Sequence, residues 1–308
     1  MIQLIKTASY TPDKVMTNYD YEKILDTSHE WIVERTGIYE RRIATTEDTS
    51  NLAIKTVEKL DLTGEEKAQI KAIFVATSTP DYNFPSIAAM IHEKFGFSED
   101  LFSMDFNVAC SGFVSGLVLL ERYLKPGERA ILVGAEVLTK IVDKKDRSTA
   151  VLFGDGAGAC LLEKTEDPFY YDVGTRGDFE KLYAKVDTSE EKEGLQMMGK
   201  DVFRFAVDAL PKSINRLMVK GGLSPEDIDH YIFHQANKRI IDYVEKKMKL
   251  DEKKIYLNLD RYGNTSAASV PLILDELWQQ GKILSRQKLL LSGFGAGLSW
   301  ATALIVMK

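Results

Sequence analysis

Short apolar runs alternate with amphipathic stretches through much of the chain. Residues 72–76 (AIFVA) and 129–134 (RAILVG) are rich in aliphatic side chains and have the length of buried strands. Residues 86–94 (SIAAMIHEK) and 111–124 read as amphipathic helices. Strands that alternate with helices in this way predict an α/β fold.

The second half of the chain repeats the pattern of the first. Each half holds the same three units in the same order. The first is a strand (72–76 and 230–234), and the second is a small-residue turn opening an apolar helix (107–117 and 261–272) followed by a strand (131–134 and 289–293). The third is a glycine-rich segment leading into a strand (153–162 and 294–304). We therefore predict a pseudo-twofold architecture. The polar segment 163–200 lacks periodicity, so we place the boundary near residue 166, between halves 1–166 and 167–308.

This repeat has a chemical consequence. Its alignment makes Cys110 the counterpart of Asn264 and puts Thr77 and His234 at similar strand ends. Because ligands in α/β sheets gather at the carboxyl ends of strands, we expect Cys110, His234 and Asn264 to converge. A cysteine at a helix N-terminus has a lowered pKa, so we expect Cys110 to be partly thiolate at neutral pH.

Composition narrows the setting. The chain has 308 residues, a net charge of -6 and two cysteines, which cannot build a disulfide framework. We find no signal peptide and no apolar run of the roughly 20 residues that a membrane span needs. Excess negative charge argues against general nucleic-acid binding. A reducing, cytoplasmic setting is the expectation.

Four motifs carry a family resemblance. They are DTSHEWIVERTGI at 26–38, FGDGAGA at 153–159, HQAN at 234–237 and GNTSAASVP at 263–271. In this order and at these separations, they resemble those of the condensing enzymes of the thiolase superfamily, specifically the β-ketoacyl-[acyl carrier protein] synthase III family, over essentially the whole chain. The resemblance implies a thiolase-like fold of two pseudo-twofold-related halves, with central mixed sheets and layered helices.

The same resemblance implies an acyltransferase reaction. Acetyl-coenzyme A (CoA) and malonyl-acyl carrier protein would give acetoacetyl-acyl carrier protein, CoA and CO2, initiating bacterial type II fatty acid synthesis. Cys110 would carry the acetyl group, with backbone N–H groups of Cys110 and Ala296 as the oxyanion hole. His234 and Asn264 would stabilise the enolate as hydrogen-bond donors. No metal or cofactor is implied.

Binding residues are implied as well. CoA would contact Thr27, Trp31, Arg35, Arg147, Phe203 and Asn237, with its adenine between Trp31 and Arg147. Residues 200–249 hold ten Lys or Arg against seven Asp or Glu, and acyl carrier protein is acidic. Its docking surface would comprise Gln235, Ala236, Asn237, Lys238, Arg239, Arg204, Lys246 and Lys247. Leu138 and Phe84 would shape the acyl pocket, with Phe84 reaching the partner's pocket in a homodimer.

Two alternatives stay open. A relative on this scaffold could use a longer or branched acyl-CoA primer or serve secondary metabolism. A catalytically silent acyl-binding or scaffold protein is the third hypothesis, against which the intact Cys, His and Asn set argues.

Other local features give structural expectations. Cys160 is interpreted as packing, and the glycines of 154–158 as a tight turn, because they lead into a strand instead of opening a dinucleotide-binding helix. Lys200 stands where the family often has Asn, and Ala296 interrupts a turn that is commonly all glycine. Pro211 is expected to kink or break its helix.

Overall fold

The computed structural model describes residues 1–185 and 194–308. A nine-stranded sheet forms its centre, in the order β11-β12-β13-β1-β7-β6-β4-β5, with β8 paired to β13. The strands of this sheet are β1 (Ile2–Tyr10), β4 (Ile70–Ala76), β5 (Phe102–Phe106), β6 (Arg129–Val137), β7 (Asp155–Lys164), β8 (Tyr171–Thr175), β11 (His230–Phe233), β12 (Lys288–Gly295) and β13 (Ser299–Met307). Two small ribbons flank it, β2 (Val15–Thr17) with β3 (Glu40–Arg42) and β9 (Leu182–Tyr183) with β10 (Gln196–Met197).

Strand pairing repeats between the halves. In the first half β1 is antiparallel to β7 and β7 to β6, whereas β6, β4 and β5 are parallel. In the second half β8 is antiparallel to β13 and β13 to β12, β12 is parallel to β11, and a parallel bridge joins Tyr231 to Ile255. The predicted α/β architecture of two related halves is confirmed. A short parallel pairing of β1 with β13 joins both sets of mixed strands into one sheet.

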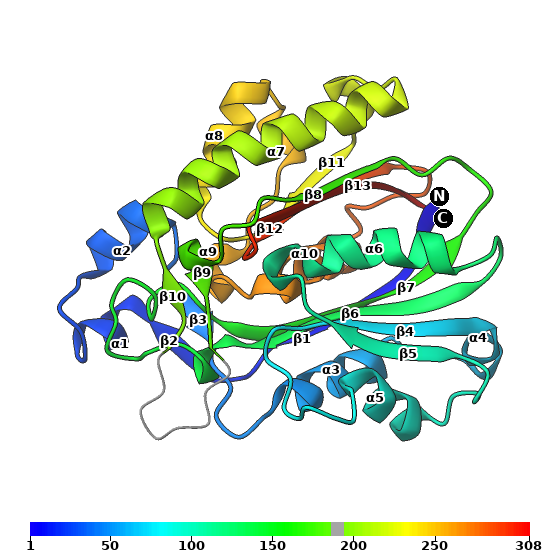
Figure 1. Ribbon diagram of the computed structural model, residues 1–308, viewed down its shortest axis with the longest axis horizontal. Helices are drawn as coiled ribbons and strands as arrows, with labels where there is room; N and C mark the ends of the chain where they lie inside the picture. Colours follow the sequence, from blue (N-terminus) through cyan, green and yellow to red (C-terminus); the bar gives the residue numbers. More distant parts are fainter. Residues whose placement is uncertain (186–193) are drawn as a thin grey trace.

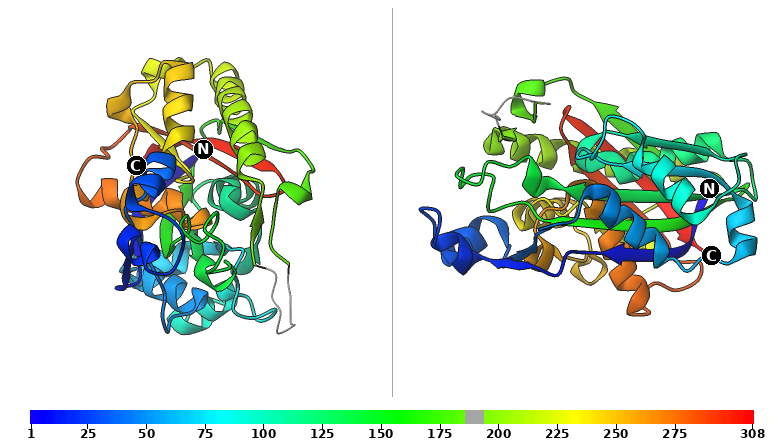
Figure 2. Two further views of the ribbon diagram at one scale, coloured as in Figure 1. Left: turned by 90° about the vertical axis from the view of Figure 1, so that its left-hand side faces the viewer. Right: turned by 90° about the horizontal axis from the view of Figure 1, so that it is seen from below.

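Helices and strands form five layers, as Figure 1 shows. The outer helices α3 (Thr49–Glu58) and α5 (Ile87–Phe95) cover the first-half strands, and α7 (Gly199–Gly221) and α8 (Lys238–Met248) cover the second-half strands. Between the two sets of strands lie α6 (Gly112–Tyr123) and α10 (Ser269–Gln279), and the left view of Figure 2 shows the outer helices again at opposite sides. The short helices are α1 (Asn18–Glu22), α2 (His29–Thr36), α4 (Gly64–Gln69) and α9 (Leu259–Tyr262).

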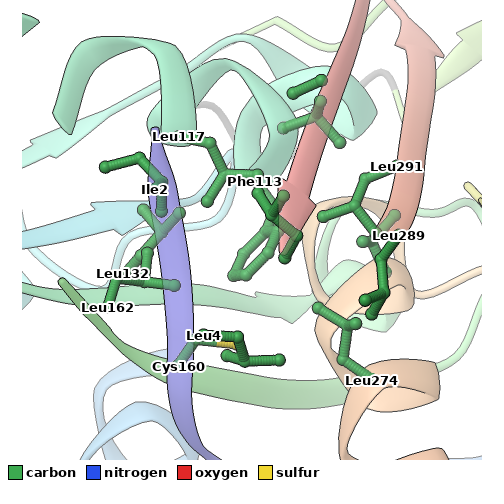
Figure 3. Packing of buried hydrophobic residues seen from close by; sticks show 14 of the residues in the cluster. Ile2, Leu4, Phe113, Leu117, Leu132, Cys160, Leu162, Leu274, Leu289 and Leu291 are labelled. Atoms are coloured by element: carbon green, nitrogen blue, oxygen red, sulfur yellow. The ribbon is translucent and has the colours of Figure 1, made fainter. Parts of the chain in front are cut away.

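The central layer owes its position to apolar faces. In α6, Phe113, Val114, Leu117 and Leu120 recur at helical spacing and are buried. Figure 3 shows Phe113 and Leu117 packed among side chains from both sets of strands and from α10. Cys160 lies in this core and is fully buried, so its interpretation as a packing residue is confirmed.

Glycines let α10 and its preceding turn approach the strands. The segment predicted as a tight turn at 154–158 instead runs into β7, where a Cβ on Gly158 would lie 2.7 Å from the Pro271 side chain. On β6, a Cβ at Gly134 would overlap the carbonyl oxygen of Ala267. The prediction of a tight turn at 154–158 was wrong, because the glycine there allows close packing between layers, which the local sequence does not reveal.

The expected break at Pro211 is also absent. Helix α7 runs unbroken for 23 residues, with Pro211 buried on the face that packs against the sheet. A proline removes one N–H donor, and the helical bonds on either side remain. Within residues 1–185 and 194–308, no helix combines the length and apolar character needed to cross a bilayer.

We expect Gly134→Ala to destabilise the protein by about 3 kcal/mol or more, because the methyl group has no space beside the Ala267 carbonyl. The matched control is Gly64→Ala in α4, where an added Cβ meets nothing within 4 Å. That control should change stability by less than about 1 kcal/mol. Denaturant unfolding measures both, and equal midpoints for the two variants would contradict the packing described.

Candidate active site

A cavity of about 900 Å³ opens at the ends of the central strands, and Cys110, His234 and Asn264 all line it. His234 follows the last residue of β11, Cys110 precedes α6, and Asn264 precedes α10. These three side chains converge on one cavity, as expected from the strand ends. Each comes from a different element, so the cavity depends on how the two halves pack.

Two equivalent turns deliver Cys110 and Asn264. Ala109 and Ser266 have positive φ angles of 47° and 48°, and each donates its backbone N–H to an asparagine Oδ1 two residues earlier, at 2.9 Å from Asn107 and 2.8 Å from Asn264. Asn107 is therefore the counterpart of Asn264. The predicted pairing of Cys110 with Asn264 was wrong by three positions.

In this register Cys110 corresponds to Ala267, and His234 corresponds to Ala76 and not to Thr77. The strand register supports the second pair, since Ala76 lies beside Gly134 in β6 and Phe233 lies beside Ser292 in β12, one residue before Gly293. Each half thus supplies chemistry where the other half has alanine.

Asn264 is fixed from both sides. Its backbone N–H donates to the Leu152 carbonyl and its own carbonyl accepts the Gly154 N–H, at 2.8 and 3.1 Å. Because Oδ1 accepts the Ser266 N–H, the Nδ2 amide is the end left to face the cavity. The side chain therefore presents a donor, as its expected role requires. The glycine motif at 153–159 anchors this asparagine.

His234 is held as a neutral imidazole. Burial lowers the pKa of His234 to about 3. Its Nδ1 lies 2.7 Å from the Ser269 hydroxyl, which is also 2.9 Å from the Ser266 carbonyl. The hydroxyl carries a single proton, and the donor role expected of His234 needs the form in which that proton goes to Nδ1. The ring proton then sits on Nε2, which makes His234 a donor toward the cavity.

Cys110 departs from its predicted ionisation. Burial raises the pKa of the Cys110 thiol to about 12, a hydrogen bond with Ser266 opposes this, and the nearby Glu136 carboxylate adds to it. A helix N-terminus stabilises a charge by up to about 2 kcal/mol, which lowers a pKa by roughly 1.5. Burial outweighs that effect, so the expected partial thiolate was wrong for the resting protein. The proton must leave when an acyl donor binds.

The end of β12 lies against the nucleophile. A Cβ on Gly295 would lie 2.8 Å from the backbone nitrogen of Cys110, and Ala296 follows on the cavity wall. Positive φ in this turn falls on Gly297, at 131°, and not on Ala296. Alanine at 296 therefore costs no backbone strain.

A passage from the cavity to the surface has aromatic and cationic walls. Trp31, Arg35, Phe203 and Asn237, which are four of the residues expected to contact CoA, line it. Lys200 lines it too. The Asn237 amide donates to the Arg35 carbonyl at 2.9 Å and ties α8 to α2.

Arg147 and Thr27 stand apart from the lining residues. The guanidinium carbons of Arg35 and Arg147 lie 4.9 and 5.1 Å from the centre of the Trp31 ring. Both guanidinium groups thus lie over the Trp31 ring, beside which the adenine is expected. The Thr27 hydroxyl is buried and without a hydrogen-bond partner among the described residues.

The expected docking surface is only partly a surface. Gln235 is fully buried, and its amide donates to the Phe233 carbonyl while its Oε1 accepts the Asn258 N–H. It cannot contact a partner protein, so this prediction was wrong; the strand-end position alone did not reveal its burial. Lys238 is exposed but paired with Asp242.

Of the remaining predicted docking residues, Arg239 and Arg204 line the cavity, whereas Lys246 and Lys247 lie in the last turn of α8 and are not among its lining residues. Ala236 and Asn237 line the cavity, and the exposed cations are Arg239, Arg204, Lys246 and Lys247. Leu138 is on the cavity wall, whereas Phe84 is 85% exposed and outside it.

Three polar residues of the site were missed from sequence. Ser266 and Ser269 lie inside the quoted GNTSAASVP motif, three positions apart, where small polar residues were interpreted only as a helix start. Glu136 is a single acidic residue in the apolar run of β6 and is fully buried. A charged residue within a buried strand was the signal. Among the described residues, no cluster of His, Cys, Asp or Glu is placed to hold a metal ion.

Known proteins resemble the chain over nearly its whole length. A family model described as 3-oxoacyl-[acyl-carrier-protein (ACP)] synthase III matches residues 104–177, and its C-terminal counterpart matches 218–307. The β-ketoacyl-[acyl-carrier-protein] synthase III of Caldanaerobacter subterraneus subsp. tengcongensis is 41% identical over 320 residues, covering 98% of this chain and 96% of the relative.

Solved structures give the same result. That of the β-ketoacyl-[acyl carrier protein] synthase III from Thermus thermophilus has a TM-score of 0.90 and 40% identity, covering 99% of this chain and 98% of that one. The priming β-ketosynthase from the R1128 polyketide biosynthetic pathway has a TM-score of 0.91 and 29% identity, covering 100% and 96%.

We expect His234 to stay in the neutral Nε2–H form between pH 5 and 8, because its folded-state pKa is about 3. The unfolded chain, with a pKa of about 6.5, takes up the proton first, so this residue's contribution to stability is lost as pH falls below about 6.5. Ring 15N NMR checks both the charge and the tautomer. Titration of His234 within this range, or a proton on Nδ1, would contradict the assignment. Ser269→Ala removes the hydroxyl beside Nδ1, so both neutral tautomers of His234 should be populated in this variant.

Proposed function

The chain belongs to the 3-oxoacyl-[acyl-carrier-protein] synthase III family, and from this membership we propose that it condenses acetyl-CoA with malonyl-acyl carrier protein to start bacterial fatty acid synthesis. The observation that carries the proposal is the shared cavity of Cys110, His234 and Asn264. These three side chains supply a nucleophile and two donors. The proposed setting is the cytoplasm, where the unpaired Cys110 and Cys160 would stay reduced.

The first half-reaction transfers the acetyl group. The Cys110 sulfur attacks the thioester carbonyl of acetyl-CoA as its proton leaves, and the S–C bond to CoA breaks. Backbone N–H groups of Cys110 and Ala296 hold the oxyanion, which the contact of β12 with the Cys110 nitrogen supports. CoA departs along the passage lined by Trp31 and Phe203.

The second half-reaction forms the carbon–carbon bond. Malonyl-acyl carrier protein loses CO2, and the resulting enolate oxygen receives hydrogen bonds from His234 Nε2 and Asn264 Nδ2. The neutral imidazole provides its donor without a change of charge. The enolate carbon then attacks the acetyl carbonyl on Cys110, whose sulfur leaves and regains a proton. Side chains and backbone N–H groups of the protein supply every group, so the proposal requires no cofactor or metal.

The acyl group lies against an apolar wall. Leu138 packs with Phe153 and Leu195, and all three line the cavity. Phe84, exposed outside this cavity, supports the proposal of a homodimer in which it enters the partner's pocket. Strand β5 ends the sheet and leaves an edge that a second copy of the chain could extend.

We also propose that residues 1–166 and 167–308 are the halves of a duplicated unit. The repeated pairing of β1, β7, β6 and β4 by β8, β13, β12 and β11 supports it, because all four strands of each set fall on one side of residue 166. The equivalent turns at Asn107 and Asn264 add a residue-level correspondence.

Acylation should occur at Cys110. We expect acetyl-CoA to acetylate the wild type and Cys160→Ala, and Cys110→Ala to take no acetyl group, because Cys160 lies in the core and cannot meet a substrate. His234→Ala and Asn264→Ala should accept the acetyl group but lose roughly a hundred- to a thousandfold in malonyl decarboxylation. Peptide mass spectrometry and CO2 release measure these steps.

The primer is tested in the same assay with isobutyryl- and octanoyl-CoA. Faster acylation by either would favour the alternative of a different primer, which the similarity to a priming ketosynthase motivates. If no acyl-CoA modifies Cys110, the protein is not the proposed transferase and the silent acyl-binding hypothesis gains.

Acyl carrier protein is proposed to dock on the cationic surface formed by Arg239, Arg204, Lys246 and Lys247. Arg239 lines the passage and lies 5.9 Å from the centre of the Phe203 ring. Arg204 lines it as well, one turn into α7. Exposed cations around a passage attract an acidic partner and raise the rate of encounter.

Arg239→Glu should raise the KM for malonyl-acyl carrier protein about tenfold, with acetylation of Cys110 by acetyl-CoA much less affected. Lys125→Glu, beyond the C-terminal end of α6, is the control of equal charge change. An unchanged KM in Arg239→Glu, or the same increase in the control, would contradict docking of acyl carrier protein at this surface.

A further inference from the structure

Glu136 is a buried carboxyl beside the nucleophile. It lies in β6, fully buried, and accepts the Ser78 N–H at 3.0 Å, the Thr79 hydroxyl at 2.8 Å and the Ser266 hydroxyl at 3.1 Å. A buried carboxylate with several donors is often only structural. Asp155 in β7 is such a case, because it accepts hydrogen bonds from Thr139 and Ala44 and makes no described contact with Cys110.

Ser266 connects Glu136 to the reacting sulfur. Its hydroxyl is bonded to Glu136 Oε1 and is also in hydrogen-bond contact with the Cys110 thiol. The backbone of Ser266 is held in place, because its N–H donates to Asn264 Oδ1 and its φ angle is 48°. Thiol, hydroxyl and carboxylate therefore form a continuous chain of polar groups.

The proposed acetyl transfer needs a proton acceptor. The thiol is protonated in the resting protein, and Asn264 presents a donor. In the donor form proposed for the condensation step, His234 carries its proton on Nε2 and could accept another there only by becoming charged in a buried site. Among the described groups in contact with the Cys110 sulfur, Ser266 is the one whose hydroxyl is hydrogen-bonded to a base, the Glu136 carboxylate.

We propose that Glu136 is a positioning residue that accepts the Cys110 proton through Ser266 during acetyl transfer. As the sulfur bonds to the acetyl carbon, its proton passes to Ser266 Oγ while the Ser266 proton passes to Glu136 Oε1. The C–S bond of acetyl-CoA breaks, and its electron pair leaves with the CoA sulfur. In the condensation step the acetyl carbon leaves Cys110, and the same proton returns to the sulfur.

Electrostatics fit this exchange. Burial raises the pKa of Glu136 to about 7, against the opposing hydrogen bonds of Thr79, Ser78 and Ser266, so the carboxylate is a base suited to neutral pH. Cys110 is the titratable group that faces it across Ser266; its other contacts are the hydroxyls of Thr77 and Thr79 and the Ser78 amide. Moving the proton between sulfur and carboxylate leaves the charge of the pair unchanged, so no additional charge is buried.

The inference rests on the proposed function, and its test separates the two. Acetylation of Cys110 under single-turnover conditions is followed by CoA release from pH 5.5 to 8.5, in the wild type, Glu136→Gln and Ser266→Ala. Asp155→Asn is the matched control, which removes a buried carboxylate outside the chain of groups. Decarboxylation of malonyl-acyl carrier protein is measured in parallel, because it needs His234 and Asn264 but no proton from Cys110.

We expect the wild-type rate to rise with pH through an inflection near 7, since Glu136 must be ionised to accept the proton. Glu136→Gln and Ser266→Ala should lose this inflection and acetylate roughly a hundredfold more slowly, with decarboxylation retained. Asp155→Asn should keep the wild-type profile. Ser266→Ala keeps the backbone bond to Asn264, so it serves if Glu136→Gln folds poorly.

Two results would overturn the relay: an unchanged rate and pH profile in both variants, or equal losses of acetylation and decarboxylation, which indicate a structural role. A wild type that takes no acetyl group on Cys110 would instead contradict the proposed function itself.

Discussion

The structure depends on the mutual packing of two equivalent turns. The turn before α10 rests on β6, where only a glycine at 134 leaves room for the Ala267 carbonyl. The turn before α6 rests on β12 in the same way, and a Cβ on Gly293 would lie 3.2 Å from the Cys110 carbonyl. Each half thus holds the other's turn. Once these contacts form, Cys110 and Asn264 face one cavity without further adjustment.

The same packing determines the electrostatics. Groups brought to the centre of five layers lose water, which lowers the pKa of His234 and raises those of Cys110 and Glu136. All three therefore favour their uncharged forms, and a charge there exists only where hydrogen bonds support it. Such a site suits a reaction that passes through a transient oxyanion and enolate, because fixed N–H donors stabilise them strongly in a dry cavity.

The alternating pattern and the repeat predict the α/β architecture of two related halves, and the quoted motifs and the strand ends single out Cys110, His234 and Asn264, which line one cavity. Predictions from the sequence were wrong where contacts between distant parts of the chain determine the register, the ionisation or the burial of a residue. The turns NVACSG and NTSAAS consist of small residues that align in more than one register, and the positive φ values of Ala109 and Ser266 that settle it are invisible in sequence. The ionisation of Cys110 depends on burial by both halves. Gln235 looked like a surface residue until the neighbouring segment, through Asn258, was in place.

The central claim is that one cavity holds two separate sites for negative oxygen, one at the backbone of Cys110 and Ala296 and one at His234 and Asn264. A crystal structure of the protein exposed to acetyl-CoA tests it most directly. The account predicts an acetyl group on the Cys110 sulfur, with its carbonyl oxygen at the N–H groups of Cys110 and Ala296 and away from the two side-chain donors. An acetyl oxygen bonded to His234 and Asn264, or no acetyl group on Cys110, would contradict it.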